Sequence, residues 1–118
     1  MSDGIDNRIA YDRGVHIRGT AIWLDAERRR DVCILTALPP RLPPRHSRVA
    51  ACAGVATALS RLGYQGPVLP VPFGRWFGFG GRQACFVDAG EDDLAAAALV
   101  DLDDARLLVA GPLRRDVI

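Results

Sequence analysis

The segment TALPPRLPPRH, residues 36–46, limits most strongly what this chain can fold into. It holds four prolines, and each proline lacks a backbone N–H donor and restricts the residue before it. The segment is therefore neither a helix nor a central strand. It follows the apolar run DVCIL (31–35) and precedes RVAACAGVATAL (48–59). The sequence predicts a stiff, arginine-bearing loop directly after a buried strand, where many α/β folds place their chemistry.

Short strands and one helix are predicted around this loop. Residues 15–17 and 20–24 read as strands of a hairpin that turns at Arg18-Gly19, and 31–35 and 48–52 read as two more strands. In residues 54–63 the apolar positions Val55, Ala58, Leu59 and Leu62 have helical spacing, and Gly63 marks the end.

The second half of the chain is typical of strands and tight turns. PVLPVPFG (67–74) is extended, and its prolines suit an edge strand or a turn. Two strands are expected around Gly80-Gly81 and two more around Asp103-Asp104. The pattern favours a β-rich α/β fold, with about eight short strands and one clear helix, in a single domain spanning residues 1–118.

Composition excludes some classes of function. The net charge is +1, and all 15 basic residues are arginines, which argues against a global attraction to nucleic acid or to an acidic membrane. Cys33, Cys52 and Cys85 stand in apolar surroundings without a CxxC pair, as expected of reduced, buried thiols. The first residues lack a signal-peptide pattern, and the longest apolar run, residues 94–100, is too short to cross a bilayer. We expect a cytoplasmic protein without membrane contact.

Two stretches carry a resemblance to a known family. GTAIWLDAERRRDVCILTALPPRLPPRHSRVAACAGVATAL (19–59) resembles the N-terminal part of the metallo-β-lactamase-fold nucleases, in the RNA-processing and DNA-ligase-associated exonuclease branch. In that branch a strand ending in Thr or Ser leads into the motif HxHxDH. DAGEDDLAAAALVDLDDARLLVAGPLRR (88–115) resembles the stretch PAGHxxGSAxxxV and the following strand pair, which ends in TGD. The resemblance covers roughly residues 14–116 and implies half of a metallo-β-lactamase-like αββα sandwich.

The same resemblance implies that the metal site of the family is lost. In register, Ala37, Pro39, Arg41 and Leu42 stand at the ligand positions of HxHxDH, Glu91 at the His of PAGH, and Pro112 at the final Asp. Ala, Pro and Leu have no lone pair to donate to a metal, and Arg stays protonated. One carboxylate does not make a transition-metal site. We therefore expect no metal, no cofactor and no hydrolase activity.

The proline loop then has a structural interpretation. It stands where the metal-binding loop would be, and its stiffness substitutes for the ordering that a metal provides. The register also predicts that Arg41 and Glu91 converge and pair in the vacated site. Because only half of the sandwich is present, an apolar sheet face would stay uncovered, which soluble monomers rarely tolerate. The partner is expected to be a second copy or a protein that supplies the missing half.

Other candidate residues each have a functional and a structural interpretation. His16 and His46 are expected to be hydrogen-bonded structural residues. The cluster Glu91, Asp92, Asp93 could bind a hard cation but is expected to be a solvated acidic turn. The runs Arg28–Arg30 and Arg114–Arg115 are expected at the surface. Arg41, Arg45 and Arg48 are candidates for nucleic-acid or partner contacts. Trp76, Phe77 and Phe79 belong either to the core or to an interface.

Three functions follow, in order of preference. The first is a catalytically inactive structural or regulatory interaction subunit, as a homodimer or as the partner of an active paralogue. The second is a nucleic-acid-binding module that keeps Arg41, Arg45 and Arg48 in a metal-free cleft. The third is an enzyme with new chemistry, although no nucleophile–base pair is readable.

Overall fold

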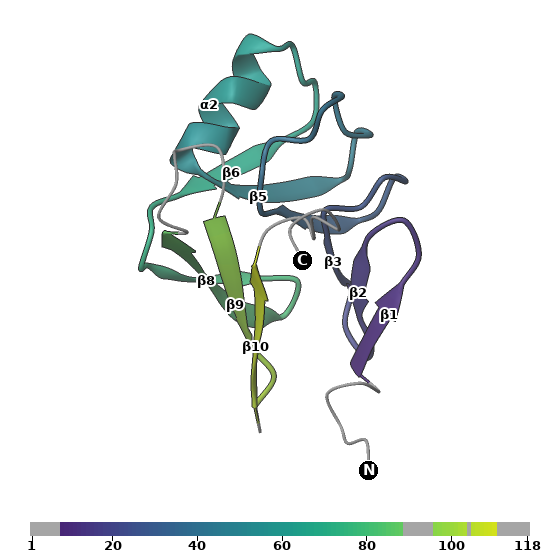
Figure 1. Cartoon of the computed structure of the whole chain (residues 1–118), viewed down its shortest axis with the longest axis vertical. Helices are drawn as coiled ribbons and strands as arrows, with labels where there is room; N and C mark the ends of the chain where they lie inside the picture. Colours follow the sequence, from purple (N-terminus) through teal and green to yellow (C-terminus); the bar gives the residue numbers. More distant parts are fainter. Residues whose placement is uncertain (1–7, 89–95, 104, 111–118) are drawn as a thin grey trace, which may run out of the picture.

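The computed structural model describes residues 8–88, 96–103 and 105–110. These residues form two sheets and one helix (Figure 1). The expected β-rich α/β class is confirmed. Ten strands are present in the described part of the chain, against about eight expected, and the sequence analysis had not anticipated the first of them, β1 (Ile9–Tyr11).

The first sheet has six strands in the order β1-β2-β3-β4-β5-β6. Strands β1 (Ile9–Tyr11), β2 (Val15–Ile17) and β3 (Ile22–Leu24) pair antiparallel, so the predicted turn at Arg18-Gly19 is present. Strands β4 (Val32–Leu35), β5 (Arg48–Cys52) and β6 (Val68–Val71) then continue parallel to β3. Parallel neighbours need a crossover connection. Between β5 and β6 this is the helix, and between β4 and β5 it is the proline loop.

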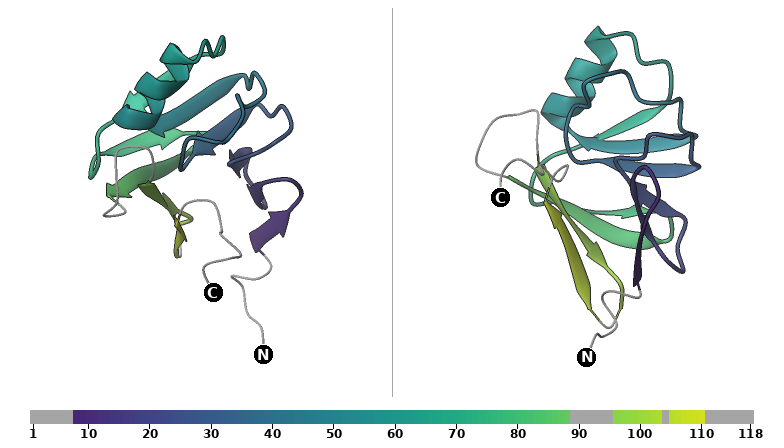
Figure 2. Two further views of the ribbon diagram at one scale, coloured as in Figure 1. Left: turned by 45° about the horizontal axis from the view of Figure 1, so that its top comes forward. Right: turned by 45° about the vertical axis from the view of Figure 1, so that its right-hand side comes forward.

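Helix α2 (Ala53–Arg61) covers one face of the first sheet. Its spacing buries Val55 and Leu59 completely, and Figure 2 shows the helix on the side turned away from the second sheet. The helix ends at Arg61 with Leu62 as its C-cap, and Gly63 follows with φ +87 and donates its N–H to the Ser60 carbonyl at 3.1 Å, as expected of a stop residue. The edge position of β6, with Pro70 in it, agrees with the expected extended segment.

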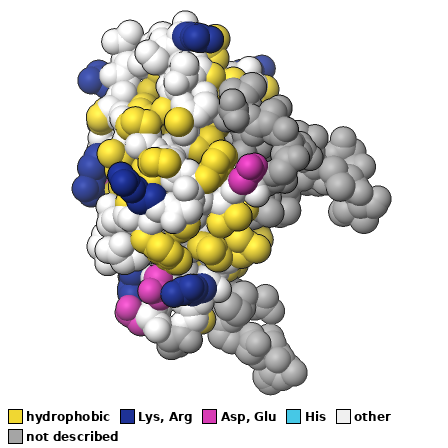
Figure 3. All heavy atoms as spheres, turned by 90° about the vertical axis from the view of Figure 1, so that its left-hand side faces the viewer, with side chains coloured by type: hydrophobic (Ala, Val, Ile, Leu, Met, Phe, Trp, Pro, Cys, Tyr) yellow, Lys and Arg dark blue, Asp and Glu magenta, His cyan; other side chains and the backbone are white. Residues whose placement is uncertain are grey.

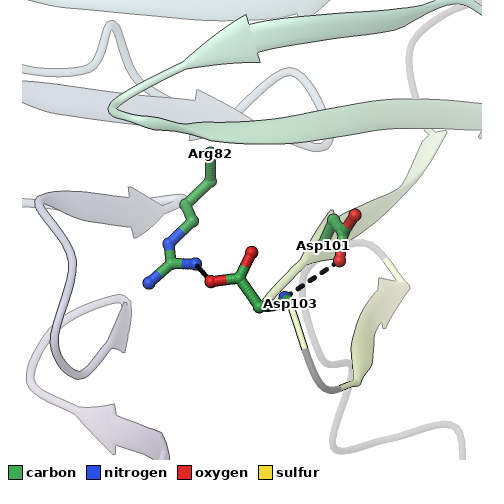
Figure 4. Close-up of polar contacts among 3 residues, drawn as sticks. All are labelled: Arg82, Asp101 and Asp103. Atoms are coloured by element: carbon green, nitrogen blue, oxygen red, sulfur yellow. Dashed lines mark hydrogen bonds and ion pairs between the residues drawn. The ribbon is translucent and has the colours of Figure 1, made fainter.

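The second sheet has four antiparallel strands in the order β10-β9-β8-β7. Strands β7 (Trp76–Phe79) and β8 (Arg82–Asp88) form the hairpin predicted at Gly80-Gly81, and β9 (Ala96–Asp101) and β10 (Arg106–Ala110) form the second one. The tip of the second hairpin is tied to β8, because Arg82 pairs with the carboxylate of Asp103 (Figure 4). Asp103 in turn donates its N–H to Asp101 at 3.0 Å.

The two sheets share one buried core. Gly80 illustrates their contact, because a Cβ atom added there would lie 2.8 Å from Ile22 and 3.1 Å from Val32. The inner residues of both sheets belong to one cluster of buried side chains, which includes Ile17, Ile22, Leu24, Val32, Ile34, Phe79, Ala84, Phe86, Ala98, Val100 and Leu107. Among the described residues, no helix has the length and apolar character of a membrane span.

Candidate functional site: an apolar sheet face and a cavity under the proline loop

The outer face of the second sheet is apolar along most of its length. Because side chains alternate along a strand, the pairing registers assign every described residue of this sheet to one of its two faces. Phe77 and Phe79 face the core, where Phe77 stacks on Phe86 with ring centroids 5.5 Å apart. The outer face (hereafter the β7–β10 face) carries Trp76, Gln83, Cys85, Val87, Ala97, Leu99, Asp101, Arg106 and Leu108.

Several large apolar side chains of the β7–β10 face reach solvent. Trp76 is 39% exposed, Val87 38% and Leu108 57%. Cross-strand pairing sets Cys85, Leu99 and Leu108 in one row, with Val87 and Ala97 in the next. On the side of the molecule seen in Figure 3, hydrophobic side chains reach the surface in several groups, with a basic side chain among them and acidic and basic ones below. The aromatic stripe Trp76, Phe77, Phe79 is therefore divided, with only its tryptophan available to a partner.

Arg106 and Trp76 meet across this face. They belong to the two outermost strands of the second sheet, yet the Arg106 guanidinium carbon lies 4.9 Å from the centroid of the Trp76 ring. The contact spans the two middle strands of the sheet, and Cys85, on the same face, is only 4% exposed. A cation held over an indole face is a favourable electrostatic contact. The pair thus fixes a rigid aromatic group at the surface.

A cavity of about 490 Å³ lies under the proline loop. It brings together four of the positions assigned by resemblance to the lost metal ligands, namely Ala37, Pro39, Arg41 and Leu42. Leu42 is 48% exposed, and its side chain forms part of an open apolar rim. The cavity stands beyond the carboxyl ends of β3 and β4, where parallel sheets commonly bind ligands. The other two positions, Glu91 and Pro112, lie outside the described residues, and so does the predicted Arg41–Glu91 pair.

Asp25 lies at the base of this cavity and was missed by the sequence analysis. Its carboxylate accepts hydrogen bonds from the Thr36 N–H at 2.9 Å and from the Thr36 hydroxyl. Burial raises the pKa of Asp25, while the hydrogen bonds from the Thr36 hydroxyl, the Thr36 N–H and the Ala37 N–H oppose this rise. The backbone of Asp25 has φ +53, an uncommon conformation for a residue with a side chain. Asp25 therefore ties the end of β3 to the start of the proline loop.

The far end of the proline loop is tied down by Tyr64. The Tyr64 hydroxyl donates to the Pro44 carbonyl at 2.8 Å and accepts from the His46 N–H at 3.0 Å. His46 is completely buried, and its Nδ1 accepts the Arg30 N–H at 3.0 Å. Burial lowers the pKa of His46, which favours the neutral ring that this acceptor role requires. The loop is thus held at both ends by hydrogen bonds to buried or half-buried side chains.

His16 also has a structural role. Its imidazole stacks on Trp23 of the neighbouring strand, with centroids 4.5 Å apart, and its Nε2 is 2.9 Å from the Thr20 carbonyl. The Arg30 guanidinium carbon lies 3.6 Å from the Trp23 ring centroid. Both histidines therefore make the structural contacts expected from the sequence.

Arg41, Arg45 and Arg48 do not gather at one site. Arg41 lines the cavity beyond the carboxyl end of β4, whereas Arg48 begins β5 and pairs with Val32 at the opposite end of β4. Arg48 is directed toward the second sheet, with its guanidinium carbon 6.0 Å from the Phe79 ring centroid. This separation does not favour a single arginine-lined groove for nucleic acid.

Comparison with known proteins gives no relative for this chain. No family model, curated protein or solved structure matches the chain. Within residues 8–88, 96–103 and 105–110, no three His, Cys, Asp or Glu side chains gather in a way that could hold a metal ion. The three cysteines are buried thiols.

Proposed function

We propose that this chain is a non-catalytic interaction subunit, structural or regulatory, that docks through the β7–β10 face onto a second copy of itself. The exposed apolar side chains of Leu108, Trp76 and Val87 on one sheet face are the observation that carries the proposal. Soluble monomers rarely leave a contiguous apolar sheet face open to water. Trp is also the type of residue that most often anchors a protein interface.

The charges on this face favour a second copy as the partner. Arg106 and Asp101 are direct cross-strand neighbours at one end of the β7–β10 face and carry opposite charges. In a two-fold interface the same patch contacts itself, so a contact between Arg106 of one copy and Asp101 of the other is made twice. A net charge of +1 gives little repulsion between two copies.

The likeness to the metallo-β-lactamase-fold nucleases belongs to this proposal. It rests on the two sequence stretches that carry the resemblance, and Ala37, Pro39, Arg41 and Leu42 line the cavity as residues of the proline loop. The side chains of Ala, Pro and Leu cannot ligate a metal, and Arg is a cation, so the proposed half-sandwich has no hydrolase chemistry at these positions. Because the two sheets already pack on one another, the second copy instead covers the outer β7–β10 face, in the cytoplasm.

Sedimentation velocity over a wide range of protein concentrations tests the proposal. We expect a reversible dimer that Leu108→Asp abolishes, because a carboxylate would be buried without a partner. Leu62→Asp is the matched control, since Leu62 is 55% exposed but lies at the end of α2. A wild-type chain that stays monomeric, or a Leu108→Asp variant that still dimerises, would contradict the proposal.

A charge exchange tests the two-fold arrangement itself. Asp101→Arg and Arg106→Asp should each weaken the homodimer, because each places like charges opposite one another. An equimolar mixture of the two variants should restore mixed dimers, because both charge contacts then join an arginine of one variant to an aspartate of the other. If the mixture dimerises no better than either variant alone, the partner does not dock in this orientation.

A further inference from the structure

The cavity under the proline loop has the properties of a preformed ligand site. Its volume of about 490 Å³ falls within the range of small-molecule pockets. One wall is a loop whose four prolines have fixed φ angles and whose ends are held by Thr36 and Tyr64. A wall that is already ordered loses little conformational entropy when a ligand binds. The cavity is therefore suited to a small molecule without any rearrangement.

Among the described residues, the lining combines apolar walls with two carboxyl groups and one guanidinium. Most of the lining residues are leucine, alanine or proline, and the charged ones are Asp25, Glu27 and Arg41. The described carboxyl groups outnumber the guanidinium, and a cation bound beside Asp25 would offset the effect of burial by favouring the ionised form of this carboxyl group. Arg41 is an exposed residue on the loop, whereas Asp25 is half-buried.

Asp25 keeps capacity for one more donor. An ionised carboxylate offers about four lone-pair positions. The hydroxyl and N–H of Thr36 and the N–H of Ala37 occupy three of them. The strained backbone at Asp25, with φ +53, is also a feature that clusters at binding sites.

We propose that this cavity binds a small organic cation that joins an ammonium group to an apolar body. The ammonium group lies at the carboxyl groups of Asp25 and Glu27, and the apolar body contacts the leucine and proline side chains of the loop. The site is separate from the β7–β10 face, so it does not depend on dimer formation.

Binding of two probes of matched size tests the charge preference. The probes are 2-phenylethylammonium and 3-phenylpropanoate, titrated into the ¹⁵N-labelled full chain while amide shifts are followed by NMR. We expect the cation to shift amides of residues 25–27 and 35–42, and the anion to bind at least several-fold more weakly. Equal affinity for both probes, or no shift with the cation, would overturn the proposal.

Surface variants then test the charged residues without disturbing the fold. Glu27→Gln should weaken binding of the cation by roughly two- to fivefold, and Arg41→Ala should strengthen it by a similar factor, as for exposed charge pairs. Arg75→Ala is the control, because Arg75 is exposed and outside the cavity lining. If Arg41→Ala and Arg75→Ala change the affinity equally, the effect is not local and the proposed site is wrong.

Discussion

Asp25 and Thr36 hold the carboxyl ends of β3 and β4 together. The Thr36 N–H lies 2.9 Å from one carboxylate oxygen of Asp25, and the Thr36 hydroxyl donates to the other. The contact joins two residues that are 11 positions apart in the chain but end neighbouring parallel strands. It fixes both the base of the cavity and the first residue of the proline loop.

Thr36→Val should destabilise the fold. Valine has the shape of threonine but leaves one oxygen of the Asp25 carboxylate without its donor, which costs about 1 to 3 kcal/mol in the free energy of unfolding. Urea denaturation measures this change. Thr57→Val is the control, because Thr57 is an exposed residue of α2, and its change should stay within about 0.5 kcal/mol. Equal stability of Thr36→Val and wild type would show that the Asp25–Thr36 contact contributes nothing.

Tyr64→Phe should loosen the far end of the proline loop. The change removes the donor to the Pro44 carbonyl and the acceptor for the His46 N–H, at an expected cost of about 1 to 3 kcal/mol. Hydrogen exchange should also show faster exchange at the His46 amide. Tyr11→Phe is the matched control, since Tyr11 is 69% exposed. If both variants lose the same stability, the loop is held by its prolines alone.

Gly80→Ala should be much more damaging than Gly81→Ala. Both glycines have positive φ, +62 and +83, so both variants carry a conformational cost of about 1 to 2 kcal/mol. Only at Gly80 would the new methyl group collide with Ile22 and Val32 of the first sheet, which adds about 1 to 3 kcal/mol. Thermal unfolding of the two variants measures the difference. Similar losses would mean that the hairpin tip does not pack against the first sheet.

His46 should make the stability depend on pH. Burial lowers its pKa below the ordinary 6.5, so between these two values the unfolded chain binds one more proton than the folded chain. The contribution of neutral His46 is therefore complete above about pH 6.5 and is lost as the pH falls, by up to about 1.4 kcal/mol per pH unit. His46→Asn keeps an acceptor for the Arg30 N–H but does not titrate. Urea denaturation at several pH values should show a flatter dependence for the variant; identical slopes would contradict this assignment.

Local patterns predicted the individual elements well. The apolar run 31–35 predicted β4, and helical spacing predicted α2. The pair Gly80-Gly81 and the aspartates at 103–104 predicted the two hairpins of the second sheet. These signals depend only on neighbouring residues. Alternation along β7 also predicts that Trp76 lies on the opposite face of the sheet from Phe77 and Phe79. Which of these two faces is buried depends on the position of the first sheet.

Long-range pairing accounts for what the sequence did not show. The Asp25–Thr36 contact requires β3 and β4 to run parallel and to end together, and no local pattern specifies that choice. The sequence offers one signal for this contact, because Asp25 directly follows one apolar strand and Thr36 directly follows the next. The separation of Arg41 from Arg48 has the same origin, because it follows from the parallel direction of β4 and β5.

The order of the strands has a consequence during synthesis. Every strand of the first sheet precedes every strand of the second, and the chain passes between them once, from Val71 to Trp76. At typical elongation rates, the end of β10 leaves the ribosome about 2 to 8 s after the end of β6. During this interval the inner face of the first sheet has no cover, so the nascent chain exposes its most aggregation-prone surface before the fold can close. Helix α2 protects only the opposite face, and chaperone dependence is expected to be greatest in this brief window.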